Sequence, residues 1–95
     1  MARSGGCLCG KVRYEANADP LMTGVCHCKN CQKQAGTAFS TLAAFQKADL
    51  AFSGELSLYE DSDTDTGNTV KRFFCGTCGS PLYSEISAQP EMAYL

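Results

Sequence analysis

Seven cysteines in 95 residues constrain this chain more than any other feature of its sequence. They occur in three short motifs, C-x-C, C-x-C-x-x-C and C-x-x-C, at Cys7 and Cys9, at Cys26, Cys28 and Cys31, and at Cys75 and Cys78. Such spacings let one backbone segment present two sulfurs to one metal ion. A chain this short buries a thin core and usually needs disulfides or a structural metal. The cysteines therefore predict a fold organised around metal ions.

Metal is favoured over disulfides, because an odd number of thiols cannot all pair. No basic segment followed by an apolar run marks a signal peptide, so we expect a cytoplasmic protein with reduced thiols. No segment approaches the ~20 apolar residues of a membrane span, so we expect no membrane association. All-thiolate ligation suits Zn²⁺ or an iron–sulfur centre. Two separate clusters without a redox partner motif favour zinc, and a C-x-x-C redox motif would need a βαβ context that is absent.

The cysteines are predicted to divide into a group of four and a group of three. The compact trio Cys26, Cys28 and Cys31 forms one unit, and the two distant pairs close a second site. Four ligands make a closed, structural zinc site, whereas three leave a coordination position open. His27, the only histidine, is a rival ligand for the trio. Alternate side chains of an extended segment point to opposite faces, so we expect His27 to point away and to be partly exposed; a role in proton transfer stays open.

The hydrophobic pattern predicts a mostly β chain. Val12, Tyr14 and Ala16 alternate with charged residues, as in a half-buried strand over residues 11–16. Residues 1–6 are interpreted as a polar lead. Further strands are expected at residues 21–25, 37–45, 51–52, 56–59, 69–74, 81–85 and 91–95. One helical turn is expected at residues 32–35, ended by Gly36, and residues 46–50 are ambiguous. We expect a single domain over residues 1–95.

Charge excludes one class of function and leaves one loop to interpret. The net charge is −2 and the eight basic residues are scattered, so we expect no nucleic-acid binding. Residues 60–68, EDSDTDTGN, carry alternate carboxylates. A calcium loop would need glycine at its sixth position and a closing glutamate, and neither is in place. We therefore interpret this segment as a solvated loop.

Three stretches, GGCLCGKVRYEA, VCHCKNCQKQAGTAF and FFCGTCGSPLY, occur in this order. Together they resemble the glutathione-dependent formaldehyde-activating enzyme family, also called the CENP-V/GFA domain. The resemblance implies an Mss4-like β-tent of short antiparallel strands stapled by zinc. It implies one structural zinc on Cys7, Cys9, Cys75 and Cys78, and a second, open and candidate catalytic zinc on Cys26, Cys28 and Cys31 that can be empty.

The sequence departs from the family pattern in two places. Family members commonly carry arginines where this chain has Gln32 and Lys33. The family domain also usually continues past the last cysteine pair, through a segment that this chain lacks. We therefore expect either that the chain is a truncated product or that part of the usual sheet and pocket wall is missing.

The resemblance implies a carbon–sulfur lyase acting on S-hydroxymethylglutathione, with glutathione as a small-thiol partner. The substrate thiol would bind at the open three-cysteine zinc. Lys29, Lys33 and Arg13 are candidates to attract its carboxylates, although each also fits a solvated surface charge. One alternative is an Mss4-like protein-binding module with purely structural zinc, and another is a metal-handling or redox-sensing protein. Catalytic residues, the true substrate and the oligomeric state are left open.

Overall fold

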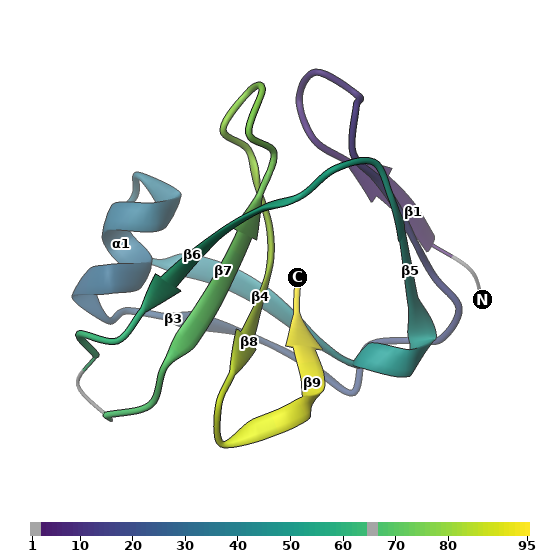
Figure 1. Cartoon of the computed structure of the whole chain (residues 1–95). Helices are drawn as coiled ribbons and strands as arrows, with labels where there is room; N and C mark the ends of the chain where they lie inside the picture. Colours follow the sequence, from purple (N-terminus) through teal and green to yellow (C-terminus); the bar gives the residue numbers. More distant parts are fainter. Residues whose placement is uncertain (1–2, 65–66) are drawn as a thin grey trace.

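The structure is a computed structural model and describes residues 3–64 and 67–95. Within these residues the chain forms two antiparallel sheets, seen on the right and the left of Figure 1. The smaller sheet has the order β1 (Arg3–Gly6), β2 (Arg13–Ala16) and β5 (Leu50–Ser53). The larger has the order β3 (Met22–Cys26), β4 (Ser40–Gln46), β9 (Gln89–Tyr94), β8 (Pro81–Ile86), β7 (Val70–Phe74) and β6 (Ser57–Asp61). The mostly β, antiparallel prediction is confirmed.

Strand β1 corrects the interpretation of the N-terminal residues as a polar lead. It pairs antiparallel with β2, so that Gly5 lies opposite Tyr14. A Cβ atom on Gly5 would lie 2.5 Å from the Tyr14 hydroxyl oxygen, which shows that the tyrosine ring crosses the glycine backbone. Glycine permits this close approach. The sequence RSGG has no apolar alternation, so its strand depends on its neighbour and not on its own pattern.

Helix α1 (Lys29–Ala35) begins three residues before the predicted helical turn and ends, as predicted, at Gly36 in the left-handed conformation. Its early start has a local cause: the Cys28 sulfur accepts a hydrogen bond from the Cys31 amide and caps the helix. Cysteine is outside the usual set of capping residues, so this start carried no sequence signal. The ambiguous segment at residues 46–50 contains a short 3₁₀ helix, Lys47–Asp49. No helix among the described residues is long and apolar enough to span a membrane.

The acidic segment at residues 60–68 is only partly a loop. Glu60 and Asp61 continue β6 and pair with Lys71 and Val70 of β7. Residues 65 and 66 lie outside the described part of the chain, as do residues 1 and 2 of the lead. Asp61 is buried, which corrects the interpretation of the whole segment as solvated.

The two sheets meet at a small core that includes cysteines. Cys7, Val12, Cys75 and Leu82 are its buried members. Aromatic rings continue the contact between the sheets: Phe52 of β5 stacks on Tyr83 of β8 with ring centroids 4.6 Å apart, and Tyr83 stacks on Phe73 of β7 at 4.5 Å. Both ring contacts add stacking energy to the burial of apolar surface. The core therefore places Cys7 and Cys75, from opposite ends of the chain, next to each other.

Candidate metal centres and the adjoining cavity

The first candidate centre is formed by the first and last cysteine pairs. Cys7 and Cys9 lie in the turn between β1 and β2, and Cys75 and Cys78 in the turn between β7 and β8. All four sulfurs lie within 4.8 Å of one another. The Sγ atoms of Cys7 and Cys9 are 3.6 Å apart, and those of Cys9 and Cys75 are 3.7 Å apart. Tetrahedral Zn²⁺ with ~2.3 Å bonds separates its sulfurs by about 3.8 Å, so the donor set fits this ion.

Hydrogen bonds orient these sulfurs and stabilise their thiolates. The Val12 amide donates to Cys7 Sγ over 3.3 Å and lowers the pKa of this thiol. The Ser80 hydroxyl lies 3.2 Å from Cys78 Sγ and accepts a hydrogen bond from the Leu8 amide. Because Ser80 Oγ only accepts from this amide, its own hydrogen is available for the Cys78 thiolate. The side chain and the amide of Ser80 together lower the pKa of Cys78 to about 5.

The four thiols do not ionise equally. The Lys11 amide lowers the pKa of Cys9, but desolvation and the neighbouring sulfurs outweigh it and raise that pKa to about 11. Adjacent thiolates repel one another, so charge concentrates on the sulfurs that hold the best hydrogen bonds. A divalent cation would remove this repulsion, because it allows all four sulfurs to be thiolates. The chemistry of the group therefore fits a closed metal site.

The second candidate centre is the trio Cys26, Cys28 and Cys31. Cys26 ends β3, Cys28 caps α1 and Cys31 lies in its first turn. Their sulfurs lie within 4.8 Å of one another, and all three residues are partly exposed. Hydrogen bonding from the Cys31 side chain is the main factor that lowers the pKa of Cys28, whereas desolvation, followed by the two other sulfurs, raises the pKa of Cys31 to about 12. Each of the two groups could hold a metal ion; its identity as zinc stays a prediction.

His27 lies outside the trio. Its ring packs against Phe39 with centroids 5.6 Å apart, and the residue is exposed. In the described part of the chain it is absent from both groups of potential metal ligands. Cys28 has extended backbone angles, as the alternation argument assumed.

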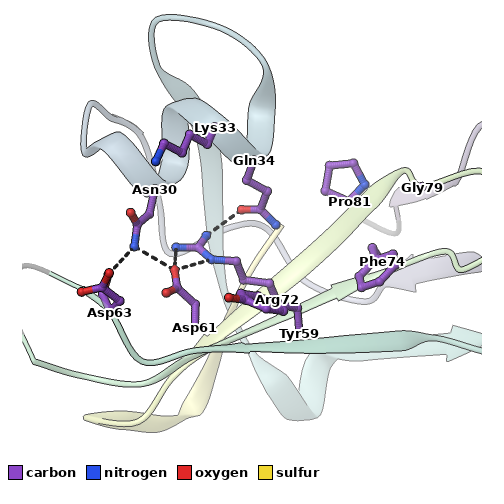
Figure 2. Close-up of a pocket in the computed structure, with 10 residues that line it drawn as sticks. All are labelled: Asn30, Lys33, Gln34, Tyr59, Asp61, Asp63, Arg72, Phe74, Gly79 and Pro81. Carbon is purple, nitrogen blue, oxygen red and sulfur yellow. Dashed lines mark hydrogen bonds and ion pairs between the residues drawn. The ribbon is translucent and has the colours of Figure 1, made fainter.

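A cavity of about 460 Å³ lies between the strands β6 and β7 and helix α1, which also carries Cys31 of the trio. Figure 2 shows helix residues above it and strand residues below it. The residues that line it are Asn30, Lys33, Gln34, Tyr59, Asp61, Asp63, Arg72, Phe74, Gly79 and Pro81. Of the three basic candidates from the sequence, Lys33 lines this cavity. Lys29 is exposed and is not among the lining residues, and Arg13 is exposed on β2 of the other sheet.

A buried ion pair between the strands β6 and β7 is hydrogen-bonded to helix α1 across this cavity. Arg72 and Asp61 are 8% and 7% exposed, and Asp61 Oδ2 accepts from Arg72 Nε at 3.1 Å and from Nη2 at 3.0 Å. Asn30 Nδ2 donates to the same oxygen at 2.9 Å, and Arg72 Nη1 donates to Gln34 Oε1 at 2.6 Å. None of the seven residues of α1 is fully buried. Polar contacts therefore provide much of the attachment of the helix that carries Cys28 and Cys31.

This network was missed in the sequence, although one signal was available. Val70, Arg72 and Phe74 alternate in β7, so an arginine takes the same face as two apolar residues. A charged residue in that phase predicts a buried ion pair. Gln34, which accepts from Arg72 on α1, is 38 residues away in the chain and carries no local signal.

Comparison with known proteins identifies a matching family and a similar solved structure. The sequence model of the family described as glutathione-dependent formaldehyde-activating enzyme matches residues 2–95. A crystal structure of a Rhodobacter sphaeroides protein is similar with a TM-score of 0.76 and 27% sequence identity, over 98% of this chain and 83% of that chain. A search of curated proteins found no match.

Proposed function

Because the chain belongs to the glutathione-dependent formaldehyde-activating enzyme family, we propose that it is a two-zinc carbon–sulfur lyase acting on the glutathione–formaldehyde adduct S-hydroxymethylglutathione. The observation that carries the proposal is the pair of cysteine groups, one with four sulfurs and one with three. Four sulfurs complete a tetrahedral site, and three leave one position for a ligand.

The four-cysteine group is assigned a structural role. Cys7 and Cys75 are buried in the core, and their turns lie at opposite ends of the chain. A metal ion there would connect the β1–β2 turn to the β7–β8 turn, and its binding energy would contribute to folding. Opening this site for a substrate would expose the core, so it is a poor place for catalysis.

The three-cysteine group is assigned the substrate thiol. Its residues are partly exposed, and Cys28 and Cys31 lie at the start of the helix that borders the cavity. Zinc held there would supply a fourth coordination position and favour the thiolate form of the substrate. In the synthetic direction, the thiolate sulfur attacks the carbonyl carbon of formaldehyde, a C–S bond forms, and the oxygen takes a proton from water. The lyase direction breaks this C–S bond and returns the proton. We assign no catalytic side chain.

The proposal is tested by calorimetry with glutathione on zinc-loaded protein and on the Cys28→Ala variant. We expect binding to the first, and loss of binding in the variant without loss of the four-cysteine metal. Exchange spectroscopy by NMR would then measure whether interconversion of formaldehyde and S-hydroxymethylglutathione is faster with the protein. Absence of glutathione heat between pH 6 and 9 would reject the thiol site.

A protein-binding module with structural zinc remains a second candidate. It is favoured by apolar side chains that are exposed around the edge strand β3, namely Leu21, Met22 and Val25. Exposed apolar groups at a strand edge are suited to pairing with another chain. This candidate predicts no response to small thiols, so the same calorimetry separates the two functions.

A further inference from the structure

The cavity between α1 and the strands β6 and β7 is lined by one basic and one acidic side chain that form no ion pair within the described part of the chain. Arg72 and Asp61 are paired with each other. Lys33 and Asp63 also line the cavity and are exposed, and within residues 3–64 and 67–95 neither side chain forms an ion pair. Figure 2 shows these two residues toward one end of the cavity, and Phe74 and Pro81 toward the other. The charges of the four ionised side chains that line the cavity sum to zero, so the cavity favours a dipolar ligand over an anion.

Helix α1 carries both Cys31 of the trio and Lys33 of this charged end. Successive helix residues rotate by about 100°, so Lys33 and Gln34 flank the cavity face and Cys31 lies beyond Gln34 on the adjacent face. A ligand that places its sulfur at the trio would have to cross this face to reach Lys33. The Asp63 main-chain oxygen is fixed by Asn30 Nδ2 at 2.7 Å, which holds the strand end beside the helix.

We propose that the cavity binds the amino-acid end of a thiol ligand, with the α-carboxylate against Lys33 and the α-ammonium against Asp63. In glutathione this end is the γ-glutamyl group, and not the glycine. A glycine carboxylate alone would satisfy Lys33 but would leave Asp63 facing a second negative charge. The zwitterion satisfies both residues. This inference rests on the proposed thiol function of the trio.

Three thiols test it on zinc-loaded full-length protein: γ-glutamylcysteine, N-acetylcysteinylglycine and 2-mercaptoethanol. The first carries the zwitterionic end, the second only the glycine end, and the third neither. We expect γ-glutamylcysteine to bind more tightly than the other two. Lys33→Met and Asp63→Asn should each weaken the binding of γ-glutamylcysteine by about three- to tenfold, as expected for partly exposed charged contacts. Neither substitution should change the affinity for 2-mercaptoethanol. Lys29→Met, on the same helix but outside the cavity, is the matched control and should change no affinity.

The outcomes separate this inference from the proposed function. If γ-glutamylcysteine binds equally well to Lys33→Met, or no better than N-acetylcysteinylglycine to the wild type, the zwitterion site is wrong while the thiol site stands. If no thiol binds, including 2-mercaptoethanol, both fail. If a variant also loses the ability to bind 2-mercaptoethanol, its defect lies in the trio. The assignment of that residue to the cavity is then overturned. Circular dichroism of each zinc-loaded variant reports in every case whether the variant is folded.

Discussion

Replacing Arg72 with methionine should destabilise the protein strongly, because it removes the main partner of a buried carboxylate. Asp61 and Arg72 side chains are each 10% exposed. Oδ2 of Asp61 accepts three hydrogen bonds, and two of them come from Arg72. Removing one member of a buried ion pair costs about 3–5 kcal/mol, since the remaining charge stays desolvated. We therefore expect the free energy of unfolding to fall by about 3–4 kcal/mol, measured by urea denaturation of the zinc-loaded protein at pH 7.

The double variant Asp61→Leu, Arg72→Met distinguishes charge burial from general damage. Without the unpaired carboxylate it should recover most of the lost stability, because an apolar pair of similar volume often matches a buried ion pair. Lys47→Ala is the matched control: its ion pair with Glu85 has a lysine side chain that is 51% exposed, so its loss should be within about 1 kcal/mol. A loss below about 1 kcal/mol in Arg72→Met, or no recovery in the double variant, would refute this account.

The same network should control metal affinity at the trio. Gln34→Ala removes the Arg72 contact to α1 and leaves Asp61 paired. Groups that orient metal-binding segments typically change affinity by about 10- to 100-fold, so the trio should bind Co²⁺ about tenfold more weakly. The four-cysteine group should keep its affinity, because no residue of α1 belongs to it. Equal weakening of both groups, or no weakening at the trio, would contradict a positioning role for Gln34.

Three further predictions concern the metal groups and the aromatic stack. Cys75→Ser should abolish the cooperative thermal transition, because Cys75 is 2% exposed in the core, whereas Cys26→Ser should keep it and lose one equivalent of metal. Graded chelator should remove metal from the partly exposed trio before the protein unfolds; simultaneous release of both equivalents with unfolding would disprove an open second site. Burial, followed by the charge and hydrogen bond of Glu85, raises the pKa of Tyr83 to about 12. Its neutral form is therefore favoured in the fold, so its contribution to stability is complete below pH 10 and is lost between pH 10 and 12. The phenolate absorbance that Tyr83 contributes late in the titration of the wild type should be lost in Tyr83→Phe.

The arrangement of the cysteines was predictable because each short motif is a local constraint. Their spacing put Cys26, Cys28 and Cys31 in one group, and the two remaining cysteine pairs could then complete a site only with each other. The position of His27 was predictable for the same reason, since it depends on three consecutive residues. The mostly β class followed from alternation in residues such as Val12, Tyr14 and Ala16. These features need no knowledge of distant contacts.

The cavity could not be predicted, because helix α1 and the strands that face it across the cavity are distant in the sequence. Asn30 and Gln34 come from α1, Asp61 from the end of β6 and Arg72 from β7. Asn30 and Gln34 look like surface residues in their own segment, and Asp61 lies in a run of acidic residues that favours a solvated loop. Only the phase of Arg72 in β7 gave a signal for burial. Only the pairing of β6 with β7 brings Asp61 beside Arg72 and below the helix. The sequence therefore indicated where metal could bind and offered Lys33 among three basic candidates, whereas Asp63, its proposed partner in ligand binding, emerged from tertiary structure.

The difference between the two cysteine groups follows from the same physical distinction. The four-cysteine group is held by turns that belong to both sheets and by a core that contains two of its members. The trio depends on a helix without a fully buried residue, attached through Asn30 and Gln34 to one ion pair. Hydrophobic burial resists local opening more than a few polar contacts do. A metal at the first group would therefore stabilise the fold, and a ligand at the second could exchange while the fold stays intact.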